Sequence, residues 1–343
     1  MGRPADGHPA DTRQVADRET RNPSVLLVRQ MVPTMRALIT GATGFVGRRL
    51  LEEIAEPVVL SRDPQRARAS LPRVEAHFWE PLAGLPPADA FAGVEAVFHL
   101  AGEPVGEGRW TAKKKQLIHD SRTVGTQNLV QALAALEHPP RVLVSASAIG
   151  YYGSRGDEVL DEASAPGDDF LAHVCRDWET ATAAAESRGI RVACTRLGVV
   201  LGSGGALAKM LLPFKLGLGG RLGSGRQWMS WIHVDDVAGI LLHAATHDNM
   251  RGPVNAVAPA PITNREFTRT LASVVHRPAI FPVPALGLRI AVGGFSEVLL
   301  SSQRVLPHAA ERAGYHFRYE RLDEALAAVV HPQKTSAQAS KTT

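Results

Sequence analysis

Three glycines, at positions 41, 44 and 47, directly follow the short apolar segment Ala37-Leu38-Ile39-Thr40. Between a strand and a helix, this spacing gives a tight turn, close approach of the backbone to a pyrophosphate, and close packing of the helix on the strand. The phosphates then lie at the positive end of the helix. A Gly-rich turn without a ligand is the alternative, but the flanking elements favour a dinucleotide site at Gly41, Thr43, Gly44, Phe45, Val46 and Gly47.

The second apolar segment ends in Leu60-Ser61-Arg62, about 20 residues after the first glycine, where an NAD-binding protein usually places an acidic residue. A hydroxyl followed by a guanidinium suits a 2′-phosphate instead, because Arg can bind phosphate with two parallel hydrogen bonds. Ser61 and Arg62 therefore predict NADP(H) as the cofactor. In the alternative interpretation Arg62 is a surface residue and Asp63 merely starts the turn.

A third part of this site follows the fourth apolar segment, at His99-Leu100-Ala101-Gly102. Small residues there let the chain pass close to the adenosine side of a cofactor, so Leu100, Ala101 and Gly102 are assigned to it. His99 is interpreted as a hydrogen-bonded histidine at a strand end and has no catalytic role. No metal site is assigned.

Positioning these residues requires parallel strands whose ends meet at one edge. Short apolar runs alternate with helical patterns from Met35 to about Ala260, which indicates repeated βα units. The predicted strands are 36–40, 57–60, 76–79, 96–100, 141–145 and 191–197, and the main predicted helices are 45–54, 113–136 and 171–187. The expected fold is α/β, a Rossmann-type doubly wound parallel sheet with a smaller C-terminal substrate lobe.

The same sequence patterns predict how the chain is divided into domains. Residues 1–34 show no periodicity and are predicted to be a disordered extension, as are residues 332–343. Residues 35–202 are assigned to the Rossmann domain, and residues 203–331 to the C-terminal lobe, with a return segment to the sheet near 228–260.

Many ordered motifs together resemble the extended short-chain dehydrogenase/reductase superfamily, and within it the epimerase family branch related to nucleotide-sugar epimerases. The resemblance covers Met35 to about His331. It rests on the glycine loop, Leu100-Ala101-Gly102-Glu103, Ser121-Arg122, the run from Ser145 to Gly153, Gly167-Asp168-Asp169-Phe170, the run from Leu212 to Gly220, the run from Gln227 to Ala238, and Asn255-Ala256-Val257-Ala258-Pro259. It implies NADP contacts at the glycine loop, Ser61, Arg62, Leu100, Ala101 and Arg122. Asp235 and Asp236 are interpreted as caps of a helix start.

The chain departs from this superfamily in its chemistry. Active members carry a Tyr-x-x-x-Lys pair on the helix after the fifth strand, and those positions are occupied here by Leu171 and Cys175. The polar residues expected beside the nicotinamide are Ser145, Ser147, Tyr151 and Tyr152, of which we assign Ser145 to the cofactor and Tyr151 with Ser147 to proton transfer. Two hypotheses remain: an oxidoreductase or epimerase with a rearranged proton donor, and a non-catalytic NADP-binding sensor or interaction protein.

Composition excludes other classes. The net charge is +4, but Lys and Arg are mixed with nearly as many acids, which disfavours a nucleic-acid surface. The Lys113-Lys114-Lys115 run is interpreted as a solvated helix face. No apolar run is long enough to span a bilayer, and two cysteines indicate a reducing compartment. We expect a soluble cytoplasmic protein, monomeric or oligomeric, that acts on a small molecule.

Overall fold

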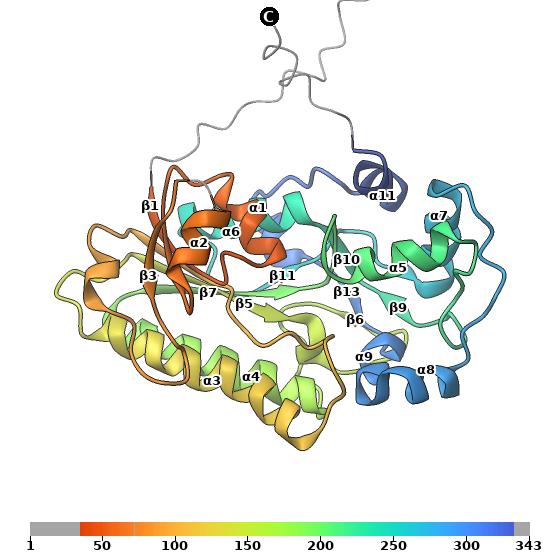
Figure 1. The fold of residues 1–343 in the computed structure, drawn as a ribbon, viewed down its shortest axis with the longest axis horizontal. Helices are drawn as coiled ribbons and strands as arrows, with labels where there is room; N and C mark the ends of the chain where they lie inside the picture. The colour runs from red at the N-terminus through yellow and green to blue at the C-terminus, as the bar shows by residue number, and fades with distance from the viewer. Residues whose placement is uncertain (1–34, 72, 333–343) are drawn as a thin grey trace, which may run out of the picture. The chain divides into compact units, whose positions relative to one another are not determined.

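A seven-stranded sheet forms the centre of the structure (Figure 1). The computed structural model describes residues 35–71 and 73–332, so the predicted extension 1–34 and the predicted tail beyond residue 332 lie outside the described residues. Every strand pair in this sheet is parallel, in the order β11-β7-β5-β4-β1-β2-β3. The strands are β1 (Arg36–Thr40), β2 (Glu56–Ser61), β3 (Glu75–Phe78), β4 (Ala96–His99), β5 (Val142–Ala148), β7 (Arg191–Leu197) and β11 (Gly252–Ala256).

Helices cover both faces of this sheet, because the strands bury apolar side chains on each side. One face packs against α1 (Phe45–Leu51), α2 (Pro64–Ser70) and α6 (Val234–Thr246) through residues such as Leu50, Ala67 and Ile240. The other face packs against α3 (Ala112–Ala134), where Leu129 and Leu133 meet Leu38 and Leu143 of the strands. Beside α3 lies α4 (Phe170–Ala183), which continues into the 3₁₀ helix η4 (Ala184–Arg188). This confirms the predicted doubly wound parallel fold.

Several of the predicted elements need correction. The strand 36–40 and the strand 191–197 have the predicted bounds, but Trp79 and Leu100 lie just outside their strands, and β5 continues to Ala148. The predicted helix 171–187 changes to 3₁₀ geometry at Ala184. β11 is a seventh strand of the sheet, in the segment 228–260 that was predicted only to return to it. The lysine run 113–115 is not a simple solvated face, because Lys114 and Lys115 contact neighbouring residues.

Lys114 and Lys115 contact the loop and helix beside them. Lys114 Nζ lies 2.5 Å from Glu103 Oε1. Lys115 Nζ lies 5.0 Å from the ring centroid of Phe170 and 5.8 Å from that of Trp110, within the range of cation–π attraction. Only Lys113 is exposed as predicted. These contacts hold the start of α3 against the loop that follows β4.

The C-terminal part of the described chain contains small two-stranded sheets and several helices. The small sheets pair β8 (Val199–Leu201) with β10 (Trp231–His233), β9 (Trp228–Met229) with β12 (Ile262–Thr263), and β6 (Val159–Leu160) with β13 (Arg304–Val305). The helices are α5 (Gly205–Lys215), α7 (Asn264–Val274), α8 (Ala285–Val292), α9 (Ser296–Leu300), α10 (His308–Arg312) and α11 (Leu322–Val330). A separate apolar cluster around Phe214, Trp231 and Phe267 forms the core of this part.

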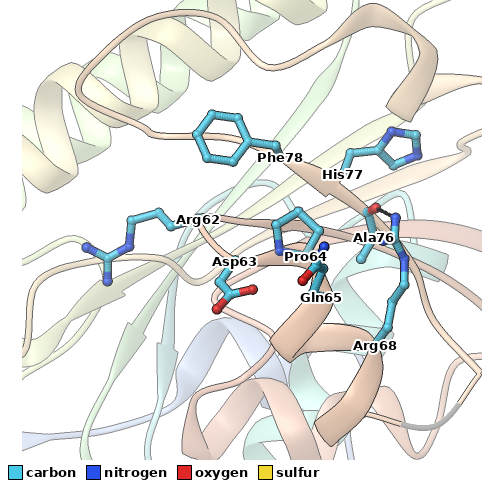
Figure 2. Close-up of a pocket in the computed structure, with 8 residues that line it drawn as sticks. All are labelled: Arg62, Asp63, Pro64, Gln65, Arg68, Ala76, His77 and Phe78. Atoms are coloured by element: carbon cyan, nitrogen blue, oxygen red, sulfur yellow. Dashed lines mark hydrogen bonds between the residues drawn. The ribbon is translucent and has the colours of Figure 1, made fainter.

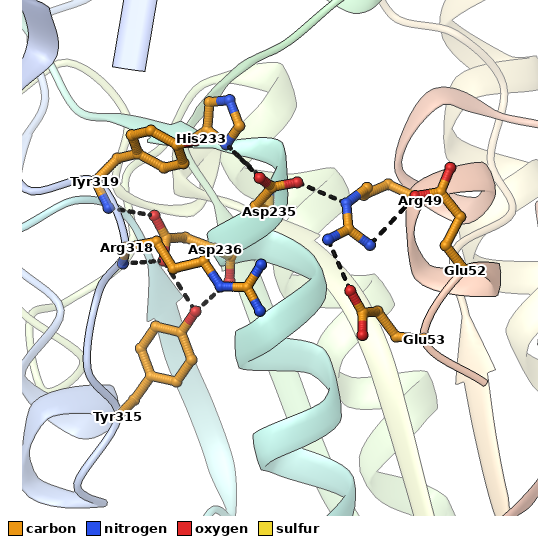
Figure 3. Close-up of polar contacts among 9 residues, drawn as sticks. All are labelled: Arg49, Glu52, Glu53, His233, Asp235, Asp236, Tyr315, Arg318 and Tyr319. Atoms are coloured by element: carbon orange, nitrogen blue, oxygen red, sulfur yellow. Dashed lines mark hydrogen bonds and ion pairs between the residues drawn. The ribbon is translucent and has the colours of Figure 1, made fainter. Parts of the chain in front are cut away.

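The start of α6 joins the C-terminal segment to α1 (Figure 3). Asp236, which is fully buried, accepts hydrogen bonds from the Tyr315 hydroxyl at 3.0 Å and from the backbone N–H of Arg318 at 2.7 Å. Asp235 accepts from Arg49 Nε of α1 at 2.6 Å. Both aspartates thus make structural contacts, as interpreted from the sequence, but the predicted capping is wrong, because His233 is the N-cap residue and accepts from the N–H of Asp235. Both carboxylates instead join α6 to other segments.

Among the described residues, no helix is both long and apolar enough to cross a membrane. The cytoplasmic location stays a prediction.

Candidate functional site

The glycine loop fits tightly against the end of β4. Gly41 has a left-handed backbone (φ +71°), and a Cβ added there would lie 2.8 Å from the carbonyl carbon of Leu100. A Cβ at Gly47 would lie 2.4 Å from the carbonyl oxygen of Gly41. Gly44, the N-cap residue of α1, is exposed, as is Thr43. Since the first N–H groups of any helix lack a helical partner, this loop exposes donors suited to a pyrophosphate.

Replacing Gly47 with alanine is expected to lower both stability and cofactor affinity. The new Cβ would meet backbone atoms of Gly41 and Ala42, which cannot rotate away as a side chain can. Overpacking of this kind costs about 1–3 kcal/mol, measurable by urea unfolding. Gly287→Ala on α8 is the control, because nothing lies within 4 Å of its added Cβ. Equal unfolding midpoints for the two variants would contradict the close packing described for this loop.

A buried hydrogen-bond chain fixes the loop after β4. Thr40 Oγ1 accepts from the backbone N–H of Leu100 and of Ala101, both at 3.1 Å, and lies 2.8 Å from His99 Nδ1. His99 Nε2 lies 3.0 Å from the hydroxyl of Thr126 on α3. Burial, with a smaller effect from Arg122, lowers the pKa of His99 to about 4, so the ring is neutral. The histidine is fully buried and hydrogen-bonded, as interpreted from the sequence.

The end of β2 borders a hollow of about 580 Å³ (Figure 2). Arg62 and Phe78, at the ends of β2 and β3, both line it and are exposed. Asp63 accepts from the backbone N–H of Arg66 at 2.9 Å and is the N-cap of α2, so its carboxylate is engaged in starting the helix. Ser61 Oγ is hydrogen-bonded to the backbone of Asp63 at 3.1 Å. Arg62 is thus the charged side chain beside the hollow that is left without a hydrogen-bond partner among the described residues.

Arg122 lies below the loop after β4. Its Nη1 donates to the carbonyl oxygens of Glu103 at 3.0 Å and of Ile118 at 3.1 Å, and its Cζ lies 5.1 Å from the Trp178 ring centroid. A Cβ at Gly102 would lie 3.1 Å from this Cζ. Burial lowers the pKa of Arg122. The guanidinium therefore supports the loop assigned to the cofactor, and a direct cofactor contact stays a prediction.

The two positions of the ordinary Tyr-x-x-x-Lys pair hold groups that transfer no proton. Leu171 packs beside Gly150, where an added Cβ would lie 3.4 Å from the Leu171 Cβ. Cys175 is buried, and this burial raises the pKa of its thiol to about 12. Both residues lie on α4 next to the segment that ends β5. Leu171 and Cys175 therefore lie beside the end of β5, where the family resemblance predicts the Tyr and Lys of the ordinary pair.

The polar residues at the end of β5 differ in their surroundings. Ser145 is fully buried and its hydroxyl lies 3.4 Å from that of Thr182, so its assignment to the cofactor stays a prediction. Ser147, on the same side of the strand, donates to Glu179 Oε1 at 2.7 Å. Tyr151 lies in the 3₁₀ helix η3 (Ile149–Tyr152) and is half-buried. Its proposed catalytic role with Ser147 is likewise untested.

Tyr152, expected beside the nicotinamide, makes structural contacts through its hydroxyl. Its hydroxyl donates to Asn255 Oδ1 at 2.7 Å and accepts from Arg196 Nη1 at 2.9 Å. Burial raises the pKa of this hydroxyl to about 12. Tyr152 therefore joins η3 to β7 and β11 and keeps its proton.

A buried ion pair that the sequence analysis missed lies beneath these residues. Arg196 of β7 donates through Nε and Nη2 to the two carboxylate oxygens of Glu179, at 2.8 and 2.7 Å. Burial alone would lower the pKa of Arg196, but hydrogen bonds to Glu179 and its charge raise it above the ordinary value. The guanidinium carbon lies 3.4 Å from the Tyr151 ring centroid. The sequence signal for this pair was Arg196 itself, a charged residue inside the mostly apolar strand β7.

A second feature missed by the sequence analysis covers the start of α1. The ring of Phe45 packs under the glycines that follow β8, and added Cβ atoms at Gly202 and Gly204 would lie 2.3 and 2.7 Å from its carbon atoms. The loop between β8 and α5 therefore needs glycine to lie over the dinucleotide loop. A glycine cluster next to the predicted domain boundary was the only available signal.

Comparison with known proteins agrees with this geometry. Residues 37–256 match the NAD dependent epimerase/dehydratase family, and residues 283–329 match a domain of unknown function, DUF1731. The chain is similar to the epimerase family protein SDR39U1 homolog, chloroplastic, of Arabidopsis thaliana, with 39% identity over 326 residues, 91% of each protein. An epimerase family protein of Mycobacterium bovis is 42% identical over 292 residues, 84% of this chain and 95% of that protein.

Among solved structures, the human epimerase family protein SDR39U1 (isoform 2), determined with NADPH, superposes with a TM-score of 0.77 and 33% identity. The match covers 87% of this chain and 100% of the human chain. Sequence and fold therefore agree over nearly the whole of the relatives' length. The chain belongs to the NAD dependent epimerase/dehydratase family.

Proposed function

We propose that this protein binds NADP(H) and catalyses a slow oxidoreductase- or epimerase-type reaction on a small molecule, with Tyr151 in place of the ordinary proton donor. The cofactor assignment rests on the glycine loop. Its backbone at Gly41 packs tightly against the backbone of Leu100, and Thr43 and Gly44 are exposed. When bound, the dinucleotide supplies or accepts a hydride at its nicotinamide. The chain's own residues hold it and move the proton.

Preference for NADP(H) over NAD(H) rests on the end of β2. Arg62 offers a positive charge beside the hollow, and Asp63, the nearest carboxylate in sequence, is engaged as a helix cap. An exposed guanidinium can bind a 2′-phosphate with two parallel hydrogen bonds, whereas a ribose hydroxyl would gain little from it. The human relative determined with NADPH supports the same preference.

Replacing Arg62 with alanine is expected to weaken NADPH binding about tenfold or more and to leave NADH binding nearly unchanged. A hydrogen bond to a charged group contributes roughly 1.5–3 kcal/mol, which corresponds to this loss. Fluorescence titration of both reduced cofactors measures it, with Arg188→Ala, an exposed arginine of η4, as the matched control. Equal losses for NADPH and NADH would show that Arg62 does not recognise the 2′-phosphate.

Proton transfer is assigned to Tyr151, supported by Ser147. Tyr151 follows β5, whose C-terminal end lies at the sheet edge where open α/β sheets bind their ligands. The guanidinium of Arg196 stacks on the Tyr151 ring and holds it in place, but Arg196 is paired with Glu179 and does not replace the missing Lys. We therefore expect turnover slower than that of enzymes with a Tyr and Lys pair.

A non-catalytic role is the second candidate, and the groups at the usual catalytic positions favour it. Leu171 has no proton to transfer, and Cys175 holds its proton at neutral pH because its pKa is about 12. The two candidates differ in one observation. An enzyme would oxidise bound NADPH when given compounds from a panel of carbonyls and nucleotide sugars, and a sensor or interaction protein would bind it without turnover.

A further inference from the structure

A basic hollow of about 320 Å³ lies beside α7, in the C-terminal part of the chain and far from β1 and its glycine loop (Figure 1). Three guanidinium groups line it: those of Arg221, Arg265 and Arg269. The apolar remainder of the wall comes from Ala272 and from the segment that includes Ile280 and Pro282. None of these residues belongs to the site assigned to the dinucleotide.

Local structure brings the three arginines together. Arg265 and Arg269 are four residues apart on α7 and so lie on one face of the helix. Gly225, with φ +70°, lets Arg221 approach Arg265, since a Cβ added at Gly225 would lie 3.3 Å from the Cβ of each. Arg221 Nη1 donates to the carbonyl oxygen of Ser224 at 2.7 Å, which holds its guanidinium in place.

The side chains of Arg265 and Arg269 are exposed at the hollow. Over residues 35–71 and 73–332, the guanidinium groups of Arg265 and Arg269 have no ion pair or hydrogen bond. The neighbouring carboxylate of Glu266 accepts from the backbone N–H and the hydroxyl of Thr263, both at 2.8 Å, in a capping box. Like charges four residues apart on a helix repel each other, and an anion bound between Arg265 and Arg269 would relieve this repulsion.

A buried hydroxyl without a partner lines the same hollow. Thr268 is 5% exposed, and its Oγ1 has no hydrogen-bond partner among the described residues. An unsatisfied buried polar group is unfavourable, and native structures rarely contain one without a reason. On α7, Thr268 lies three residues after Arg265 and directly before Arg269. Its hydroxyl and the two guanidinium groups would together form a set of donors for one anion.

We propose that this hollow binds a phosphate-type oxyanion, carried by a small molecule whose apolar part contacts Ile280 and Pro282. Guanidinium groups bind phosphate oxygens with paired hydrogen bonds, and a doubly charged anion neutralises several of them better than a carboxylate. The Thr268 hydroxyl donates to one further oxygen. Nothing in this proposal depends on the reaction at the dinucleotide site.

Calorimetric titration of the full chain with inorganic phosphate and with pyrophosphate tests the proposal. The double variant Arg265→Ala/Arg269→Ala should bind them about tenfold more weakly or worse, because it loses two charged hydrogen-bond donors. Thr268→Val should also weaken binding while leaving the free protein at least as stable, since it removes an unsatisfied hydroxyl. Arg312→Ala, an exposed arginine of α10, is the control and should bind as the wild type does.

NADPH titration of the same variants separates this site from the dinucleotide loop. The double variant should keep wild-type NADPH affinity. Unchanged phosphate and pyrophosphate binding by the double variant would overturn the proposal, because the anions would then occupy another site such as the glycine loop. Acetate binding as tight as phosphate binding would overturn the assignment of the ligand class.

Discussion

Replacing Glu179 with alanine is expected to lower the free energy of unfolding by about 3–5 kcal/mol, because it leaves a buried arginine without its counter-charge. The Arg196 side chain is 3% exposed, and both oxygens of Glu179 accept from it. The hydroxyl of Ser147 also loses its acceptor. Three elements, β5, α4 and β7, therefore lose one shared polar contact, and urea unfolding measures the result.

Two comparisons make this result specific. Glu186→Ala removes the same charge from an exposed position on η4 and should change stability by less than about 0.5 kcal/mol. Glu179→Gln keeps the shape and one acceptor oxygen and should be less destabilising than alanine. A Glu179→Ala variant as stable as the Glu186→Ala variant would show that solvent reaches Arg196.

The second large effect concerns turnover. Provided that the protein consumes NADPH with some substrate, Tyr151→Phe is expected to abolish that activity and to leave cofactor binding unchanged. The substitution removes only the hydroxyl, and the phenyl ring can remain stacked on Arg196. Because no hydrogen bond from the Tyr151 hydroxyl to the described residues exists, stability should barely change.

Tyr152→Phe is the matched control for this experiment. It removes two hydrogen bonds, to Asn255 and from Arg196, and leaves these buried groups unsatisfied, so it should cost about 1–3 kcal/mol in stability. Activity should survive where the variant is folded. The opposite pattern, with an active Tyr151→Phe and an inactive, folded Tyr152→Phe, would move the catalytic role to Tyr152.

The sequence was sufficient for the parallel sheet because its strands are short, apolar and separated by clear turns. β1 and β7 have the predicted bounds, and the glycine loop lies between β1 and α1 as the spacing required. β11 escaped prediction as a strand because Gly252 and Pro253 begin it, residues that normally weaken a strand. Pairing with β7 at the edge of the sheet outweighs this local preference.

Features that depend on contacts distant in sequence could not be predicted. Glu179 follows the buried Trp178 on α4, but its pairing with Arg196, 17 residues further along the chain, cannot be inferred from local spacing. Asp236 lies in the first turn of α6 and therefore resembled a cap, but its carboxylate accepts hydrogen bonds from Tyr315 and Arg318, 79 and 82 residues further along the chain. The glycine spacing thus predicted the tight packing of the loop after β1, and tertiary contacts decided the roles of residues elsewhere.

We propose that the glycine loop and the end of β2 together bind NADP(H) in preference to NAD(H). Titration of the purified wild-type protein with NADPH and with NADH, under identical salt and pH, tests it most directly. Binding of NADPH about tenfold or more tighter than NADH is the expected result, since the two cofactors differ only in the 2′-phosphate that Arg62 would contact. Equal affinity for both cofactors, or binding of neither, would contradict it.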